Sequence, residues 1–253
     1  MISDPLFYAV AIPAVILVGL GKGGFGGAMA MLGVPIMALT ISPVAAAAIL
    51  LPILLVMDAV SLVLYRRKFD VSLLKLMIPA TTLGVVIGYF TASFVNDTVV
   101  RLLIGIMAVA FALNYWLRKA EDVPQKQPSM IKGWFFGTLA GFTSFVSHSG
   151  GPPYQIYTVP LRLDKLIFVG TSVVVFSYVN AIKLVPYFLL GQFNTENLFT
   201  SAVLLPLAPI STLAGVWLVK HISQKVFYSV IYVLIFLVGL KLIGDGMSPF
   251  FNG

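Results

Sequence analysis

The 253-residue sequence has no cysteine, two histidines and few charged residues. The absence of cysteine excludes disulfides, thiolate metal sites and cysteine nucleophiles. Charged residues make up 10% of the chain, whereas an ordinary soluble domain carries about 25%. Acidic residues are the scarcer sign, with 9 Asp and Glu against 16 Lys and Arg. No stretch is polar enough to form a soluble domain, so that class of protein is excluded.

Apolar residues take the place of the missing charge. They make up 59% of the chain, and the mean hydropathy is +1.01. Apolar runs of about 20 residues recur along the whole length, and each can cross a hydrocarbon core of about 30 Å. We therefore predict an all-α polytopic membrane protein. The first residues, MISDPLFYAV, lack the basic n-region of a cleavable signal peptide. The net charge of +7 is better explained by basic cytoplasmic loops than by binding to nucleic acid.

One polar linker divides the chain into two halves. It is the stretch RKAEDVPQKQPSMIK (118–132), which contains two prolines. We predict a first membrane repeat at 1–118, a cytoplasmic linker at 119–130 and a second membrane repeat at 131–253. Breaks at charges, glycines and prolines divide the halves into apolar stretches, which we expect to form about eight to ten membrane segments. These stretches are 5–21, 23–41, 43–65, 71–95 and 99–117, then 131–147, 149–161, 166–190, 198–219 and 226–244.

Each half follows one plan, a glycine-broken helical pair or hairpin followed by three transmembrane helices. GGFGGAMAMLGVP (23–35) matches HSGGPPYQIYTVP (148–160), because a double glycine is followed by apolar residues and a proline. TTLGVVIG (81–88) matches STLAGVWL (211–218). An odd number of segments per half places the halves in opposite orientations. The sequence therefore predicts two inverted repeats.

Basic residues support this topology. With five segments per half, the second face receives only Arg101 and Lys241, and both termini lie on that side. The positive-inside rule then makes the first face cytoplasmic. The second broken pair favours a hairpin over two crossings, because 149–161 is too short to span the bilayer. The basic residues of the first face are Arg66, Arg67, Lys68, Lys75, Arg118, Lys119, Lys126, Lys132, Arg162, Lys165, Lys220 and Lys225.

The two strongest helix breakers lie at matching places in the two halves. They are the glycine run at 21–27 and the SHSGGPP turn at 147–153. Transporters built from inverted repeats bind substrate where broken helices meet near the midplane. Free N–H groups at a helix start can hold an anion there, and glycine lets the backbone approach closely. Gly84 and Gly88, by contrast, are expected to serve helix packing.

Four ionisable side chains fall inside apolar segments, where such groups are functional candidates by default. Lys22, between two predicted glycine breaks, is expected to supply charge to a site. His148, flanked by Ser147 and Ser149, is a candidate anion ligand or proton relay. Lys183 lies opposite Asp58 in the repeat alignment, and either an ion pair between them or a substrate role for Lys183 remains open. Asn180 shares the helix face of Lys183 and can donate hydrogen bonds.

The balance of these groups predicts an anionic cargo. Three Lys or His side chains face one buried carboxylate, whereas metal-cation transporters usually gather several. We expect no metal site and no cofactor. Asp58 and His148 are candidates for coupling or for an ion pair. The predicted substrate-binding residues are Lys22, Gly23, Gly24, Gly26, Gly27, His148, Ser149, Gly150, Gly151, Asn180 and Lys183.

Other function classes fit less well. GKGGFGG lacks the GxxxxGK[ST] pattern of a phosphate loop, and no predicted strand precedes it. Ser147 and Ser149 adjoin His148 in sequence and do not face it on a helix, so a Ser–His enzyme is disfavoured. A retinal protein with Lys183 as its Schiff base leaves the paired glycine breaks without a purpose. A passive anion channel stays open as an alternative to a secondary transporter.

Two long stretches resemble a known family. GLGKGGFGGAMAMLGVPIMAL…PVAAAAILLP and GFTSFVSHSGGPPYQIYTVPLRLDKLIFVGT…VNAIKLVPYFLLGQF are similar to the paired motifs of the TauE/SafE family of bacterial membrane permeases. The resemblance covers nearly the whole chain and is most specific in the GGPP and NxxKxxPY elements. Many relatives carry a plain glycine triplet near position 22, so Lys22 marks a subgroup or a changed substrate. The resemblance implies transport roles for Gly23, Gly24, Gly26, Gly27, His148, Gly150, Gly151, Asn180 and Lys183.

This resemblance implies movement of sulfite or an organosulfonate-type anion across the bacterial cytoplasmic membrane. The expected partners are a small anion, protons as a coupling ion, and the lipid bilayer. We expect no enzymatic activity.

Overall fold

The described part of the chain is helical throughout. The computed structural model describes residues 2, 4–27, 29–91, 97–117 and 127–251, and no strand occurs among them. This confirms the predicted all-α class. In chain order the α-helices (α) and 3₁₀ helices (η) are α1 (Pro5–Gly24), η1 (Ala30–Leu32), α2 (Gly33–Met37), α3 (Pro43–Leu64), α4 (Val71–Thr91), α5 (Asp97–Leu117), α6 (Met130–Ser147), α7 (Gly151–Thr158), η2 (Val159–Leu161), α8 (Lys165–Leu189), α9 (Thr195–Leu204), α10 (Leu207–His221) and α11 (Gln224–Phe251).

Several helices are long and apolar enough to cross a membrane. In the described part of the chain these are α1, α3, α4, α8 and α11, and the bent pair α9–α10 is a sixth candidate if it forms one broken span rather than a re-entrant loop. The predicted total of eight to ten membrane segments stays a prediction beyond these six. The predicted boundaries of the linker fall partly on 118–126, outside the described residues.

Local signals explain where the long helices begin. Asp4 caps α1 by accepting a hydrogen bond from the Leu6 N–H at 2.9 Å, and Ser42 caps α3 in the same way, with Pro43 at its first position. Asp164 caps α8 through the Leu166 N–H at 2.9 Å. Such caps satisfy N–H groups that have no partner within the helix. Each cap therefore marks a boundary that is written locally in the sequence.

The first helix runs further than the sequence indicated. We expected a break around Gly21 and placed Lys22 between two breaks, but α1 continues to Gly24. The break lies at Phe25–Gly27, where Gly26 and Gly27 adopt positive φ values of 59° and 82°. Close packing explains the difference, since the glycines of the last turn lie directly against the backbone of α10.

The segment expected at 198–219 is not one straight helix. It consists of α9 and α10, which are bent by 47° relative to each other. Pro206 lies between them and has no N–H to continue the hydrogen-bond ladder.

Neither broken pair has a long return arm. After α1 the chain returns through η1 and α2, and after α6 it returns through α7 and η2. Each return arm spans well under the roughly 30 Å of a hydrocarbon core at about 1.5 Å per helical residue. We call each long helix with its short return arm a hairpin; the re-entry into the membrane that the sequence favoured for the second pair stays a prediction.

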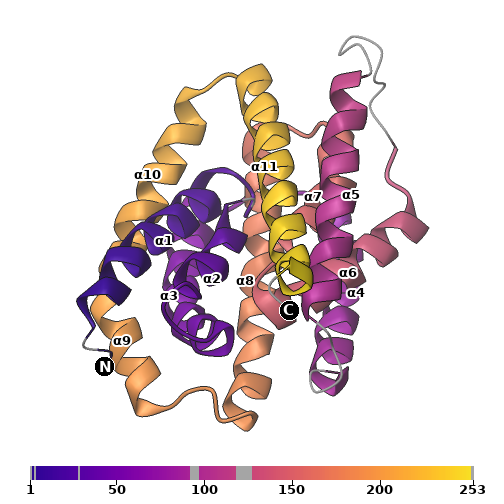
Figure 1. The fold of residues 1–253 in the computed structure, drawn as a ribbon. Helices are drawn as coiled ribbons and strands as arrows, with labels where there is room; N and C mark the ends of the chain where they lie inside the picture. Colours follow the sequence, from indigo (N-terminus) through magenta and orange to yellow (C-terminus); the bar gives the residue numbers. More distant parts are fainter. Residues whose placement is uncertain (1, 3, 28, 92–96, 118–126, 252–253) are drawn as a thin grey trace.

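Helices from the two halves pack against one another (Figure 1). The most extensive contacts join α4 with α6, α5 with α11, and α1 with α10, while α3 packs against α8. If α1 corresponds to α6 and α4 to α9–α10, the α1–α10 contact is the counterpart of the α6–α4 contact. This pairing agrees with a two-fold plan, and the inversion itself stays a prediction.

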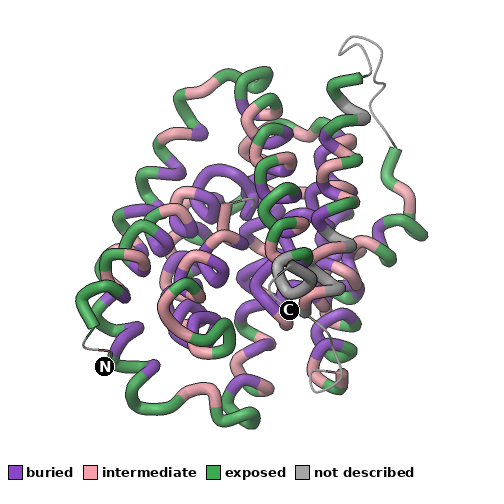
Figure 2. The backbone as a smooth tube through the Cα atoms, in the orientation of Figure 1, coloured by how far each residue is buried: buried purple, intermediate pink, exposed green. Residues whose placement is uncertain are grey.

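The helices around α1, α2, α3 and α8 hold the most buried part of the chain (Figure 2). The largest apolar cluster includes Phe7, Val18, Leu50 and Met57, with Tyr187 from the second half. Gly84 lies at the α4–α6 contact, where a Cβ atom would be 2.0 Å from the Thr138 carbonyl oxygen. This geometry agrees with the packing role expected for Gly84.

Several basic loops lie at one end of the bundle. The loop after α3 contacts the first turns of α8, where the Asp70 N–H donates to Thr171 Oγ1 at 2.9 Å. The start of α8 contacts the start of α11, where the Lys165 N–H donates to Gln224 Oε1 at 2.9 Å. The chain just before α1 contacts α9 instead, since the Ile2 N–H donates to Thr200 Oγ1 at 3.0 Å.

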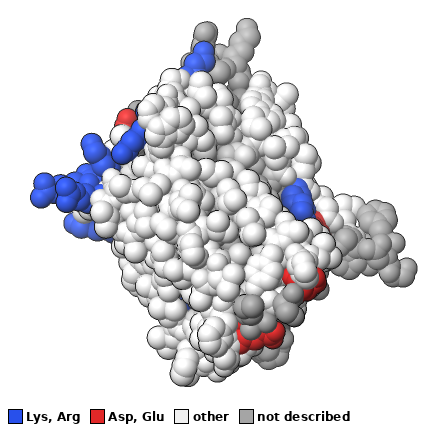
Figure 3. All heavy atoms as spheres, turned by 90° about the vertical axis from the view of Figure 1, so that its left-hand side faces the viewer, with Lys and Arg blue, Asp and Glu red and all other residues white. Residues whose placement is uncertain are grey.

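In Figure 3 most Lys and Arg atoms gather toward the upper left, and most acidic atoms lie toward the lower right. This grouping is the one that the positive-inside rule requires. The side of the membrane on which each end lies stays a prediction. Arg118, Lys119 and Lys126 are outside the described residues.

Candidate functional site

The two glycine-rich breaks meet inside the bundle. Gln155 of α7 donates from Nε2 to the Phe25 carbonyl oxygen at 3.0 Å and to the Gly26 carbonyl oxygen at 3.3 Å. These carbonyls belong to the break after α1, which leaves them without helical partners. One fully buried amide therefore joins the tips of the two hairpins.

A buried ion pair links the tip of the first hairpin to α3. Lys22 in the last turn of α1 contacts Asp58 Oδ1, and both side chains are at most 5% exposed. Asn180 of α8 donates from Nδ2 to Asp58 Oδ2 at 2.6 Å. The Lys22 ammonium also lies 5.8 Å from the centroid of the Phe176 ring, within the range of a cation–π contact. Each carboxylate oxygen of Asp58 is thus held by a different helix.

A second buried pair links the tip of the second hairpin to α8. Lys183 Nζ lies 2.7 Å from His148 Nδ1 and donates to the Ser144 carbonyl oxygen at 3.0 Å. His148 Nε2 lies 3.1 Å from the Ala47 carbonyl oxygen of α3. Because a carbonyl oxygen only accepts hydrogen bonds, Nε2 carries a proton and donates. His148 adopts the left-handed conformation with φ 53° and ends α6.

This arrangement corrects the expected ion pair. The sequence left open a pair between Asp58 and Lys183, but Asp58 pairs with Lys22, and Lys183 contacts His148 and Ser144. The two basic residues at the hairpin tips therefore bind partners on α3 and α8 of their own halves. Asn180 connects the first of these pairs to the second half through its hydrogen bond to Asp58.

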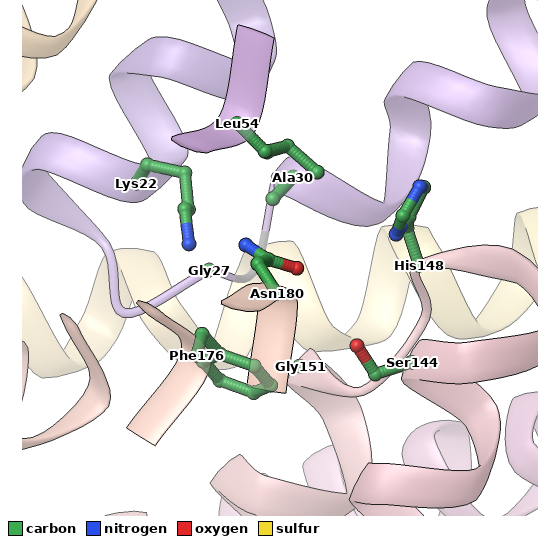
Figure 4. Close-up of a pocket in the computed structure, with 9 residues that line it drawn as sticks. All are labelled: Lys22, Gly27, Ala30, Leu54, Ser144, His148, Gly151, Phe176 and Asn180. Carbon is green, nitrogen blue, oxygen red and sulfur yellow. The ribbon is translucent and has the colours of Figure 1, made fainter. Parts of the chain in front are cut away.

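A small cavity lies between these pairs (Figure 4). Its space for water-sized molecules is about 20 Å³, which is enough for about one water molecule. Figure 4 shows the nitrogen ends of Lys22 and Asn180 pointing into the same space, with His148 across from them. The volume of the cavity is too small for an oxyanion in this conformation. Its lining consists of Lys22, Gly27, Ala30, Leu54, Ser144, His148, Gly151, Phe176 and Asn180.

Some of the predicted site residues line this cavity and others do not. Lys22, Gly27, His148, Gly151 and Asn180 line it. The remaining members of the predicted set lie behind the lining or against a neighbouring helix: Gly23, Gly24, Gly26, Ser149, Gly150 and Lys183.

The neighbours of these other residues explain their positions. At Gly23 and Gly24 a Cβ atom would be 2.1 Å from the Thr212 carbonyl oxygen and 2.5 Å from the Gly215 carbonyl oxygen, so both glycines allow α1 to approach α10. At Gly26 a Cβ atom would be 2.6 Å from the Phe168 ring, so this glycine allows the ring to lie close to the backbone.

At the second turn, Gly150 lies against the Ala140 carbonyl oxygen, where a Cβ atom would be 2.6 Å away. Ser149 Oγ accepts a hydrogen bond from Ser147 Oγ at 3.0 Å and donates to the Ser147 carbonyl oxygen at 3.1 Å. Lys183 is not part of the lining, but it contacts two lining residues, His148 and Ser144.

Several backbone N–H groups that we expected to bind an anion donate to carbonyl oxygens of the protein instead. At the first break the N–H groups of Phe25 and Gly27 both donate to the Gly21 carbonyl oxygen, at 3.0 and 3.1 Å. The expectation of a free helix start there is wrong, because the break is the C-terminal end of α1. At the second break Pro152 and Pro153 have no N–H, and the Ser149 N–H donates to Thr143.

Several residues of the site were not predicted from the sequence. Ser144 and Phe176 line the cavity, and Gln155 joins the hairpins. Tyr65 donates its hydroxyl to the Gly23 carbonyl oxygen at 2.6 Å, and burial raises the pKa of this phenol, which keeps it a donor. Gln155 follows the GGPP turn inside an apolar segment, and an amide at membrane depth was a signal that could have identified it.

Among the described residues no three His, Asp or Glu side chains are grouped as metal ligands. The polar groups of the cavity are cations, amides and hydroxyls, which are hydrogen-bond donors suited to an anion.

Comparison with known proteins gives one match. No curated protein and no solved structure matches the chain. The model of the sulfite exporter TauE/SafE family matches residues 11–242, which include every residue of the cavity and of both buried pairs. The chain therefore belongs to the sulfite exporter TauE/SafE family of membrane permeases.

Proposed function

We propose that this protein is a secondary transporter that binds a small oxyanion, either sulfite or an organosulfonate, between the tips of its two hairpins. The observation that carries the proposal is the cavity between Lys22, Asn180 and His148, where both glycine-rich breaks meet. We place the protein in the bacterial cytoplasmic membrane with its basic end inside. We assign it no catalytic chemistry.

The chemistry of the cavity favours an oxyanion over a cation. Lys22 offers an ammonium group, Asn180 an amide and Ser144 a hydroxyl. The one buried carboxylate nearby, Asp58, is occupied by Lys22 and Asn180. A sulfonate or sulfite group presents several acceptor oxygens, so these donors match it.

The small volume of the cavity supports a carrier rather than an open pore. A space for about one water molecule has to widen before an oxyanion enters, and it has to open to each side in turn for transport. The two hairpins are the elements that we expect to move, because one side chain, Gln155, joins their tips through two hydrogen bonds, and loss of these bonds lets one tip separate from the other. Opening of one hairpin at a time gives alternating access around a fixed site.

The Lys183–His148 pair is the candidate for proton coupling. The 2.7 Å contact between Lys183 Nζ and His148 Nδ1 holds a proton that either nitrogen can keep or release. Uptake of that proton adds one positive charge beside the cavity. An anion and a proton would then bind together.

A passive anion channel is the second candidate, because the same donors would also suit a selective pore. A channel requires a continuous pathway wide enough for the anion, whereas the space between the hairpin tips has room for about one water molecule in this conformation. Flux measurements in proteoliposomes distinguish the two. A carrier accumulates anion when a proton gradient is imposed, and a channel gives the same flux without it.

The direct test is anion-dependent thermal stabilisation of the purified protein. The panel contains sulfite, sulfate, methanesulfonate and acetate, since a ligand that binds the native state raises the unfolding midpoint. Oxyanions of sulfur are expected to give the largest shift. Asn180→Leu removes one donor without changing the charge of the site, and Lys22→Met leaves the buried Asp58 carboxylate without its ammonium partner beside the anion. Each should therefore abolish the shift. Equal shifts in the wild type and in both variants would refute the proposed site.

A further inference from the structure

The geometry of the Lys183–His148 pair limits its charge. His148 Nε2 donates to the Ala47 carbonyl oxygen, so a second ring proton would have to sit on Nδ1. Nδ1 lies 2.7 Å from Lys183 Nζ, which leaves room for one proton between the two nitrogens. The pair therefore carries a charge of one at most, whichever nitrogen holds the proton.

The Lys22–Asp58 pair adds no net charge. The ammonium and the carboxylate are in direct contact and both are buried. Asn180, which holds the second oxygen of Asp58, is neutral. While this ion pair is intact, Lys22 contributes a donor to the cavity but no uncompensated charge.

The other charged groups on the helices that contact α3 are not part of the cavity lining. α9 carries Glu196, and α10 carries Lys220 and His221, and all three side chains are exposed. Asp4 at the start of α1 and Lys165 at the start of α8 are at the ends of their helices. None of them lines the cavity. The buried site thus balances a single negative charge.

We propose that the cavity selects singly charged oxyanions and that Asp58 is the residue that sets this valence. The inference rests on the proposed function and names its substrate class: an organosulfonate or hydrogen sulfite rather than sulfate or doubly charged sulfite. A second negative charge has no partner in the buried site, and an unpaired charge is strongly disfavoured in a low-dielectric interior. Removal of the Asp58 charge frees Lys22 to balance a second negative charge on the ligand.

The experiment compares methanesulfonate with sulfate by isothermal titration of the purified full-length protein at constant ionic strength. Both ligands are tetrahedral sulfur oxyanions, and they differ by one charge. The wild type is expected to bind methanesulfonate at least about tenfold more tightly, a difference that titration resolves. Asp58→Asn keeps the shape of the side chain and should reverse the preference. Asp245→Asn, a matched change in an exposed pair with Lys241, should leave the preference unchanged.

A double variant keeps the test independent of the folding of Asp58→Asn. Lys22→Met combined with Asp58→Asn removes both charges of the buried pair, so the site again balances one charge and should prefer methanesulfonate, with weaker binding. Wild-type protein that binds both anions equally would overturn the inference while leaving the proposed function intact. An unchanged preference in Asp58→Asn would overturn it as well. Absence of binding to either anion would refute the proposed function, and the inference would fall with it.

Discussion

Substitution of Gly23 distinguishes a glycine that packs helices from one that contacts a ligand. A Cβ atom at this position would lie 2.1 Å from the Thr212 carbonyl oxygen and 3.1 Å from the Val216 amide nitrogen of α10. Ordinary contact of a Cβ atom begins at 3.4 Å, so Gly23→Ala has to move α1 away from α10 by more than 1 Å at this point. The obstacle is backbone, which cannot turn aside as a side chain can.

The expected cost follows from this clash. Overpacking of a tight interface costs about 1–3 kcal/mol, and the upper part of this range applies because a backbone carbonyl is displaced. Alanine regains up to about 1 kcal/mol of helix propensity over glycine. We therefore expect Gly23→Ala to lower the free energy of unfolding by about 1–2 kcal/mol without any anion present. The measurement is denaturant unfolding in detergent, monitored by fluorescence of the three tryptophans.

Gly244→Ala is the matched control. Gly244 lies within α11, and nothing in the described structure is within 4 Å of a Cβ atom there. The same substitution should leave stability unchanged or raise it by up to about 1 kcal/mol. If Gly23→Ala unfolds like the wild type but loses anion binding, then Gly23 serves the ligand and the packing argument is wrong.

Three further predictions concern the hairpin tips and the topology. Tyr65→Phe removes the donor to the buried Gly23 carbonyl oxygen and should lower the free energy of unfolding without ligand by about 1–3 kcal/mol. The control is Tyr8→Phe, which should cost less because the Tyr8 hydroxyl donates to the partly buried Ile2 carbonyl oxygen near the start of α1. Equal effects of the two substitutions would contradict the role of Tyr65 in holding the tip of the first hairpin. Gln155→Met keeps the length of the side chain but loses both hydrogen bonds to the first hairpin, so amide hydrogen exchange at Phe25 and Gly27 should accelerate; unchanged exchange there would show that this amide does not hold the tips together. Because the chain has no cysteine, single cysteines report sidedness directly: Glu196→Cys should react with an impermeant thiol reagent in intact cells and Lys225→Cys only after permeabilisation, and the opposite result would invert the topology.

Local signals in the sequence were sufficient for the class of protein, but they misplaced the break after α1, which lies at Phe25–Gly27, and did not show the bend between α9 and α10. Hydropathy over a window of about 20 residues reports a membrane helix without knowledge of its neighbours. Proline, double glycine and a capping aspartate likewise act on the residues beside them. The four buried ionisable groups were also visible, because a charge inside an apolar run stands out at any position.

Only the tertiary structure decided which of these groups are partners. Lys22, Asp58 and Asn180 come from three helices, and their contact depends on the way in which α1 and α8 pack against α3. Gly23 and Gly24 looked like ligand-binding glycines, yet they face the backbone of α10, because helix rotation about its axis is set by packing and not by composition. The charge available to an anion therefore depends on a pairing between distant residues, and no local pattern in the sequence specifies that pairing.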